Sequence, residues 1–485
     1  MRRTFSYLKF NSHTFSTTNL YRNLYLGWLR TGILGIAPVE AYLRGFVDEA
    51  GWGFRKVFYR SERSVRAIFD SDRHRVFGAT AYLDQKREME ILCRAARESG
   101  KLLVVGGFLV SLTGEIGRAL RQELFAINPD LLIVFGAGMG GQFLTNILTA
   151  QPGREREAPG VIWWDGRQER WNKPSAIITA DQCFDIMNRN GFVPRDRHPY
   201  HPARDVTVFL QSGGCQYGKC SFCSRRAVCI GRVSTGKMLD ILATYYRRGL
   251  RNFKTLEEDV LVFKDALREL PRLFAGKDIC VDGQMGGQRI LRHRELLEEL
   301  LSSGIRLNVR WGAENGVDRI LKFLGKDVSA AENYAVVDTL AGLAKRYPGR
   351  ITTEMFLIDV VPDITMDELK EHLLFLSHCV ENGIVIFSTI GISRLYYFPG
   401  SDLYRKNVLE KEAGPLPWYV TPKIEDARIE AMCSSFAFRP ELIKMMTKKW
   451  IGKTAHTQAR EYLARFRALA GVSRELEAQH TRTDG

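Results

Sequence analysis

The tightest group of metal-ligating residues in this sequence is a cysteine trio in the stretch "GGCQYGKCSFCSRR". Cys215, Cys220 and Cys223 lie within nine positions, and Gly218 shares their loop. Thiolates are soft ligands that select zinc or iron–sulfur clusters. A structural zinc site needs four protein ligands, and the next cysteine, Cys229, lies six residues beyond the trio. Three cysteines without an evident fourth favour a four-iron cluster with one iron left open for a substrate. Zinc is the alternative.

Glycines follow two predicted strands of the first half, "KLLVVGG" and "DLLIVFGAG". Here short apolar runs alternate with amphipathic helices, which predicts an α/β fold with a parallel sheet wound on both faces. Gly106 and Gly107 end one strand, and Gly136 and Gly138 follow the other. Ligands of open α/β sheets bind at the carboxyl ends of strands, where glycine lets the backbone approach them closely. The sequence therefore predicts a ligand shelf, with tight turns that need a positive φ as the alternative.

The second half has the elements of a barrel. Six strand candidates alternate with amphipathic helices: "VTVFLQSG", "NFKTLEE", "DICVDGQ", "LNVRWGAE", "ITTEMFLIDV" and "IVIFSTIGI". Six βα units predict a partial or complete (β/α) barrel. The cysteine trio directly follows the first of these strands, so we expect its loop at the mouth of the barrel, where barrel active sites lie.

We expect three parts in the chain. Residues 1–200 form the doubly wound domain with an N-terminal extension and a linker that holds a small hairpin around Asp165 and Gly166. Residues 201–410 form the barrel, and residues 411–485, which have helical periodicity and no strand pattern, form a helical cap.

Composition narrows the functional classes. The chain has 70 Lys and Arg against 55 Asp and Glu, and the excess is spread along it. This distribution argues against a nucleic-acid-binding tail and leaves acidic partners open. The sequence has neither the apolar stretch of a signal peptide nor that of a membrane span. Nine cysteines, an odd number, indicate a reducing cytoplasm, and Cys280, Cys379 and Cys433 read as core thiols.

The motif "GGCQYGKCSFC" at the start of a (β/α) region resembles the radical S-adenosylmethionine (SAM) superfamily. The resemblance implies a [4Fe–4S] cluster on Cys215, Cys220 and Cys223, with SAM chelating the fourth iron. It also places Phe222 near the adenine of SAM. The spacing here is C-x4-C-x2-C, whereas the family usually has C-x3-C-x2-C. Gly218 can supply the bend for the extra residue.

Further motifs of the same family follow in order. The stretch "NFKTLEEDVLVF" stands where the family carries an acidic pair, which implies that Glu257, Glu258 or Asp259 contacts the SAM amino group or the substrate. "VRWGAENGVDRILKFLGKD" is similar to the family's "GxExGxDxxLxxxxK", which implies that Glu314 binds the ribose hydroxyls. A carboxylate suits that role because it accepts two hydrogen bonds from a vicinal diol. Asp359 or Val360 stands where relatives have a glycine.

A doubly wound domain ahead of the barrel resembles the cobalamin-binding subclass of radical SAM enzymes. "VVGGFLVSLTGE" matches the first element of its cofactor cradle, and "VFGAGMGG" matches the second in its glycines. The resemblance implies that Gly106, Gly107, Gly136 and Gly138 hold cobalamin. A domain that keeps the fold and binds nothing is the alternative.

The resemblance as a whole implies a cobalamin-dependent radical SAM methyltransferase that acts on an unactivated carbon of a small molecule or peptide. A low-potential electron donor such as flavodoxin or ferredoxin would reduce its cluster. Two alternatives stay open at this point. One is radical chemistry without methyl transfer, such as a rearrangement, an epimerisation or a dehydrogenation. The other is a zinc-stabilised binding module. The sequence names neither the substrate nor a catalytic side chain.

Overall fold

The structure is a computed structural model of the 485-residue chain. It describes the chain apart from residues 1–3, 11–42, 44, 60, 72–75, 82–85, 108, 136–139, 175–177, 180, 183–184, 187–205, 210–214, 216, 225–232, 248, 250, 256, 387–392, 412–415, 418, 437–459, 461–462, 465–466 and 469–485. The chain divides into two compact units. The first unit comprises Met1–Gly218, Cys223–Ile241 and Tyr397–Val420, and the second comprises Lys219–Phe222, Leu242–Tyr396 and Thr421–Gly485.

A seven-stranded sheet with the order β2-β1-β3-β4-β5-β6-β7 forms the centre of the first unit. Strands β1 to β5 pair in parallel, and the last two pair antiparallel. The order 2-1-3-4-5 is that of flavodoxin-like doubly wound folds. The strands are β1 (Thr4–Phe10), β2 (Gly53–Tyr59), β3 (Val76–Thr80), β4 (Leu102–Gly106), β5 (Leu132–Val134), β6 (Val161–Trp164) and β7 (Glu169–Trp171).

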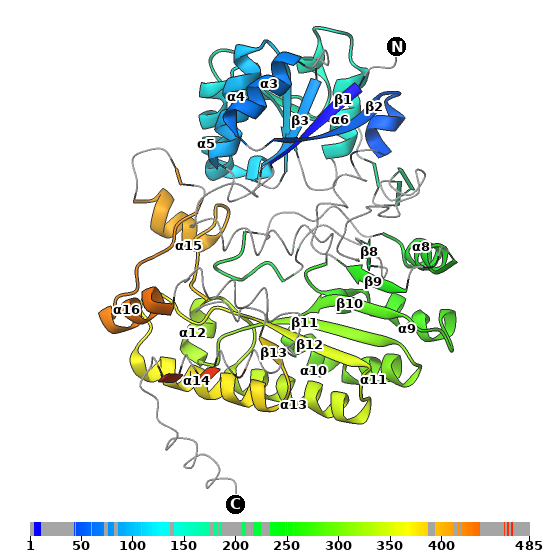
Figure 1. Cartoon of the computed structure of the whole chain (residues 1–485), viewed down its shortest axis with the longest axis vertical. Coiled ribbons are helices and arrows are strands. Elements are labelled where there is room, and N and C mark those ends of the chain that lie inside the picture. Colours follow the sequence, from blue (N-terminus) through cyan, green and yellow to red (C-terminus); the bar gives the residue numbers. More distant parts are fainter. Residues whose placement is uncertain are drawn as a thin grey trace, which may run out of the picture. The chain divides into compact units, whose positions relative to one another are not determined.

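Helices lie on both faces of this sheet. In Figure 1, α3 (Glu62–Ser71), α4 (Lys86–Glu98) and α5 (Gly114–Ile127) lie together on one side, and α6 (Gly140–Thr149) lies on the other. Because both faces are covered, the central strands are near-continuous apolar runs. Leu103, Val104 and Val105 of β4, for example, are all buried. The predicted α/β fold with a parallel sheet is confirmed.

The hairpin that the sequence predicts around Asp165 is present as β6 and β7, and it extends the edge of the sheet. The Asp165 carboxylate closes its turn by accepting hydrogen bonds from the backbone N–H groups of Arg167 and Gln168, both at 2.8 Å. Arg121 on α5 binds Glu169 of β7 through two 2.8 Å hydrogen bonds, which fix the hairpin to this helix.

The second sheet has six strands in the order β13-β12-β11-β10-β9-β8, which is sequence order reversed. The pairs from β9 to β13 are parallel. Sequential parallel order is the order of a (β/α) barrel, and among the described residues β8 and β13 do not pair. The strands are β8 (Val206–Phe209), β9 (Asn252–Thr255), β10 (Cys280–Met285), β11 (Arg306–Glu314), β12 (Ile351–Leu357) and β13 (Val385–Ile386).

Helices follow these strands and cover one face of the sheet, as Figure 1 shows for α9, α10, α11, α13 and α14. Capping boxes start the two longest helices: Ser329 with Glu332, and Thr365 with Glu368, which satisfies their first N–H groups. The helices are α8 (Thr235–Arg247), α9 (Lys264–Leu273), α10 (Gly287–Arg292), α11 (Arg294–Ser302), α12 (Asp318–Phe323), α13 (Ala330–Arg346) and α14 (Met366–Glu381).

The described part of the C-terminal region is helical and short. It contains α15 (Asp402–Tyr404), the π-helical turn η7 (Arg405–Leu409) and α16 (Ala427–Phe436). Single 3-10 turns occur at η3 (Leu109–Ser111), η4 (Glu155–Glu157) and η6 (Val260–Phe263). Within the described residues, no helix has the length and apolar character needed to cross a membrane.

Candidate functional site

The predicted site residues of the second half follow the carboxyl ends of parallel strands, which meet at one edge of the sheet. The cysteine trio follows β8, Glu257 and Glu258 follow β9, and Glu314 is the last residue of β11. The topology therefore brings their loops to the edge at which barrel enzymes bind their ligands.

All three cysteines of the trio are half-buried, and none of them is in a disulfide. Cys220 belongs to the second unit, whereas Cys215 and Cys223 are grouped with the first. The described residues, which include the trio, contain no group of three or more His, Cys, Asp or Glu side chains that could hold a single metal ion. The role of the trio as cluster ligands stays a prediction.

The loop of Cys220 packs against the turn that ends α12. Ser221 donates two hydrogen bonds to this turn, from its backbone N–H to the carbonyl oxygen of Leu324 and from its hydroxyl to that of Phe323, both at 2.8 Å. A Cβ atom at Gly325 would stand 2.5 Å from the carbonyl oxygen of Lys219. Gly325 has a φ of +70°, so both the close approach and the left-handed backbone require glycine here.

Lys326, the next residue, connects this loop to Glu314. Its ammonium group donates to the carbonyl oxygen of Gly312 at 3.1 Å and to the Glu314 carboxylate at 3.4 Å. Burial alone would lower the pKa of Lys326, but the charges of Glu314 and of the Cys220 thiolate outweigh burial, and the pKa is raised. The structure therefore brings Cys220, Glu314 and Lys326 together at one place.

Glu314 has a strained backbone. Its φ of +62° is the one positive value among the described residues other than glycine, and the pairing of β11 with β12 shifts register between Gly312 and Glu314. The left-handed region is costly for a side chain that cannot stabilise it locally, and such strain clusters at functional sites. This finding supports the predicted importance of Glu314. Its ion pair with Lys326 also fits a purely structural role, that of a salt-bridged glutamate at the end of a strand.

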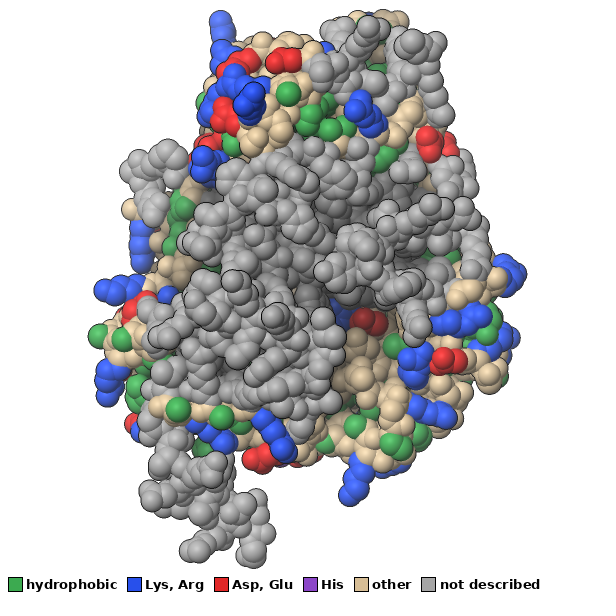
Figure 2. Space-filling model, in the orientation of Figure 1, with side chains coloured by type: hydrophobic (Ala, Val, Ile, Leu, Met, Phe, Trp, Pro, Cys, Tyr) green, Lys and Arg blue, Asp and Glu red, His purple; other side chains and the backbone are tan. Residues whose placement is uncertain are grey.

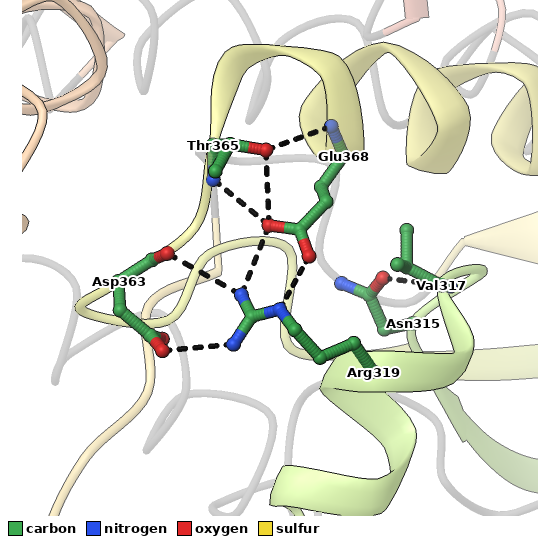
Figure 3. Close-up of polar contacts among 6 residues, drawn as sticks. All are labelled: Asn315, Val317, Arg319, Asp363, Thr365 and Glu368. Atoms are coloured by element: carbon green, nitrogen blue, oxygen red, sulfur yellow. Dashed lines mark hydrogen bonds and ion pairs between the residues drawn. The ribbon is translucent and has the colours of Figure 1, made fainter.

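Three charged side chains, which we call the clasp, hold the segment that follows Glu314: Arg319, Asp363 and Glu368. Figure 3 shows Arg319 of α12 between Asp363 and Glu368. Glu368 also accepts hydrogen bonds from Thr365 at the start of α14. Arg319 donates to Asp363 at 2.8 Å and binds both oxygens of Glu368, one of them at 2.9 Å. The hydrogen bond from Arg319 lowers the pKa of Glu368 to about 2. Asn315, in the same view, caps the backbone N–H of Val317 at 3.1 Å.

The acidic residues after β9 differ in their surroundings. Glu257 is buried and Glu258 is half-buried. Asp259 accepts a hydrogen bond from the backbone N–H of Leu261 at 3.0 Å and pairs with Arg289 at 2.9 Å. Burial raises the pKa of Asp259 to about 6, although Arg289 opposes the shift. The roles of Glu257, Glu258 and Asp259 toward SAM or the substrate stay predictions.

Sequence reasoning missed a set of polar residues on the second sheet. Along β10 and β11 they alternate with buried apolar residues and therefore lie on the opposite face of the sheet. Asp282 of β10 pairs with Arg310 of β11 at 2.5 Å, and Arg310 lies in register with Glu354 of β12. Barrel interiors are usually filled with branched apolar side chains. The signal was visible as the alternation of polar and apolar residues in "CVDGQM" and "RLNVRWGAE".

In the first unit, packing accounts for both described glycines of the predicted shelf. A Cβ atom at Gly107, where φ is +106°, would stand 2.6 Å from the Thr80 side chain, and one at Gly106 would stand 3.1 Å from Val134. Gly136 and Gly138 lie outside the described residues. Gly106 and Gly107 follow β4 at the carboxyl edge of a sheet whose order reverses between β1 and β3, and folds of this order bind ligands at that edge.

The fold and the site define a class: a flavodoxin-like α/β sheet followed in the chain by a parallel six-stranded (β/α) sheet with a cysteine-bearing loop after its first strand. No family model matches the sequence, and no curated protein matches it either. Solved structures do match. One is the apo, selenomethionine-labelled cobalamin-dependent SAM radical enzyme OxsB, with a TM-score of 0.62 and 13% identity over 96% of this chain and 72% of that chain.

A second match is the radical SAM methyltransferase TsrM from Kitasatospora setae with cobalamin and a [4Fe–4S] cluster bound. It has a TM-score of 0.60 and 15% identity over 87% of this chain and 79% of that chain. OxsB with aqua-cobalamin and SAM bound matches with a TM-score of 0.58 and 12% identity over 100% of this chain and 81% of that chain. The chain therefore has the fold of cobalamin-dependent radical SAM enzymes, and the resemblance inferred from its sequence is confirmed at the level of the fold.

Proposed function

We propose that this protein is a cobalamin-dependent radical SAM enzyme that methylates an unactivated carbon of a small molecule or peptide. The observation that carries the proposal is the likeness in fold, across both units, to enzymes of this class. The cysteine motif after β8 and the strained Glu314 add support from independent parts of the chain.

The chain's thiols fit an iron–sulfur cluster on Cys215, Cys220 and Cys223. These three are half-buried, whereas Cys93, Cys379 and Cys433 are buried. A cluster ligand must be a thiolate, and burial raises the pKa of Cys93 to about 12 and that of Cys433 to about 11. The trio is the better ligand set. When bound, the cluster and SAM would supply a radical that removes hydrogen from the substrate, and cobalamin would supply the methyl group.

The residues around the trio have roles in this proposal. Glu314 would accept hydrogen bonds from the ribose hydroxyls of SAM, Phe222 would lie near the adenine, and Glu257 or Glu258 would meet the amino group. Lys326 balances the negative charge of Glu314 and of the Cys220 thiolate, so that the site can hold several acidic groups close together. In the first unit, the strand ends at Gly106, Gly107, Gly136 and Gly138 would hold cobalamin.

The proposal is tested by expressing the chain with added cobalamin and reconstituting it anaerobically with iron and sulfide. We expect about four irons per chain and an absorption spectrum with cobalamin bands over an iron–sulfur shoulder. With methyl-labelled SAM and candidate substrates, label should move to carbon and 5′-deoxyadenosine should form.

The other outcomes separate the alternatives. An iron–sulfur shoulder without cobalamin bands, or 5′-deoxyadenosine without methyl transfer, would favour a rearrangement, epimerisation or dehydrogenation. Zinc without iron in the anaerobically purified protein would contradict radical chemistry and favour a binding module.

A further inference from the structure

The strained corner at Glu314 is held by the two residues that follow it. Asn315 is fully buried, and its amide donates to the carbonyl oxygen of Ile358 at 2.9 Å. Gly316 donates its backbone N–H to Nδ1 of His372 on α14 at 3.2 Å. A left-handed residue other than glycine persists only where its surroundings fix it, and these contacts fix this corner from two sides.

His372 uses both ring nitrogens. Because Nδ1 accepts from Gly316, the ring proton must lie on Nε2, and Nε2 donates to Oδ1 of Asp359 at 2.9 Å. Both side chains are 0% exposed. Around His372, α14 is apolar: Leu369, Leu373 and Leu376 are buried. A buried polar pair in an apolar environment is costly unless its hydrogen bonds are made, and here each nitrogen has a partner.

Asp359 extends this connection to a third strand end. Its Oδ2 accepts from the backbone N–H of Ser393 at 2.6 Å, and its own N–H donates to the carbonyl oxygen of Ser393 at 2.8 Å. In the order β13-β12-β11, Asp359 follows the middle strand, His372 reaches the corner after β11, and Ser393 follows β13. One buried pair therefore ties together the carboxyl ends of three neighbouring strands.

We propose that His372 is a positioning residue for Glu314: by accepting the Gly316 N–H it holds the corner in the conformation that presents the Glu314 carboxylate to SAM. Asp359 fixes the tautomer that makes this possible, because an acceptor at Nδ1 requires the proton on Nε2. The inference rests on the proposed function for the identity of the ligand, and on the contacts above for the corner itself.

Two substitutions of His372 distinguish a role in positioning Glu314 from a role in the stability of the fold alone. In His372→Asn the side-chain oxygen can take the place of Nδ1 and accept from Gly316, but the side chain is too short to reach Asp359. In His372→Gln the amide nitrogen can take the place of Nε2 and donate to Asp359, but no acceptor stands at the position of Nδ1. Asn leaves a buried carboxylate without this partner and should be the less stable variant.

The readouts are urea unfolding, hydrogen exchange of the Gly316 amide in the unliganded chain, and the Kd for SAM of the reconstituted protein. We expect His372→Gln to exchange faster at Gly316 and to bind SAM about tenfold more weakly, the effect of losing one hydrogen bond. We expect His372→Asn, although less stable, to keep slow exchange and near wild-type affinity. Leu373→Val, a destabilising control on the same helix, should leave both the exchange and the affinity unchanged.

If the less stable variant, His372→Asn, binds SAM more weakly than His372→Gln, then affinity depends only on stability and the positioning role is overturned. Equal Gly316 exchange in the two variants would overturn it as well. Failure of the wild-type chain to bind SAM would contradict the proposed function instead, and the exchange rates of the unliganded variants would still decide whether His372 holds the corner.

Discussion

The seven cysteines that the structure describes fall into two groups by their burial. Cys93, Cys379 and Cys433 are buried, and burial raises the pKa of each of these thiols, that of Cys93 to about 12 and that of Cys433 to about 11. Burial likewise raises the pKa of the half-buried Cys280 to about 11. Such thiols stay protonated at neutral pH and are poor ligands. Cys215, Cys220 and Cys223 are half-buried on one loop. Among the described cysteines, those best suited to bind a metal therefore lie on the loop after β8.

This difference predicts the result of single cysteine substitutions. Cys220→Ala should lose most of the bound iron and the iron–sulfur absorbance after anaerobic reconstitution, because a cluster on three thiolates cannot spare one. Cys433→Ala is the matched control and should retain the iron of the wild type. Iron and sulfide analysis of both proteins checks the expectation, and equal iron loss in the two variants would show that the trio has no special role.

At the residue scale, the sequence predicts the cysteines and Glu314 because both stand in local motifs. It misses the residues that act on them from a distance. His372 and Asp359 are separated from Gly316 along the chain by 56 and 43 positions, and only the packing of α14 on the strand ends brings them together. A histidine within the apolar run "LKEHLLFL" and an aspartate within "FLIDVV" were the available signals.

At the scale of elements, the strands that the sequence predicts are those buried on both faces or bounded by glycines, such as β4 and β5. Strands β1 and β2 were missed because "TFSYLKF" and "GFRKVFY" mix basic and apolar residues; β2 is the edge strand of the sheet, and β1 is its inner neighbour. Edge strands carry such residues because one side faces solvent. The capping boxes of α13 and α14 were likewise readable as Ser-x-x-Glu and Thr-x-x-Glu patterns.

The clasp between α12 and α14 makes a prediction about pH. The pKa of Glu368 is lowered from 4.5 to about 2, first of all by its hydrogen bond to Arg319. A carboxyl with a lowered pKa stabilises the folded state above its unfolded pKa, and this stability is lost as pH falls from about 4.5 toward 2. Glu368→Gln should therefore lower the free energy of unfolding by about 1–2 kcal/mol at pH 7, a range that allows for solvent screening.

Urea unfolding between pH 7 and pH 3 checks this expectation. The difference between wild type and Glu368→Gln should shrink below about pH 4.5, where the wild-type carboxyl begins to protonate. Asp367→Asn, at a side chain that is 92% exposed, is the control and should change stability little at any pH. A difference that stays constant down to pH 3 would show that the clasp is not electrostatic.

At the scale of the whole molecule, identities of 12–15% accompany a match over nearly the full chain. Packing requires apolar residues of suitable volume rather than particular ones, so the two sheets can persist while the sequence diverges. The sequence could not predict which segments belong to which unit. Tyr397–Val420 follows the second sheet in the chain, yet it belongs to the first unit. There Lys86 donates to the carbonyl oxygen of Leu416 at 2.9 Å, a contact across 330 positions.

Charge is the other property of the whole molecule. The formal net charge is +15, and Figure 2 shows Lys and Arg side chains at many separate places on the described part of the face in view. A spread excess of this kind provides long-range attraction for an acidic protein without a dedicated binding patch. If an acidic flavodoxin is the electron donor, attraction should speed the encounter more than it tightens the complex.

Reduction of the reconstituted cluster by an acidic flavodoxin should therefore slow about tenfold when the ionic strength rises from about 0.01 M to 0.3 M, since the screening length falls over that range from about 30 Å to less than 10 Å. Stopped-flow absorbance at the iron–sulfur shoulder measures the rate. Photoreduced deazariboflavin, which carries no net charge, is the control reductant, and its rate should not change with salt. A flavodoxin rate that is equally indifferent to salt would mean that the positive charge of the chain does not serve electron delivery and is a solvated surface only.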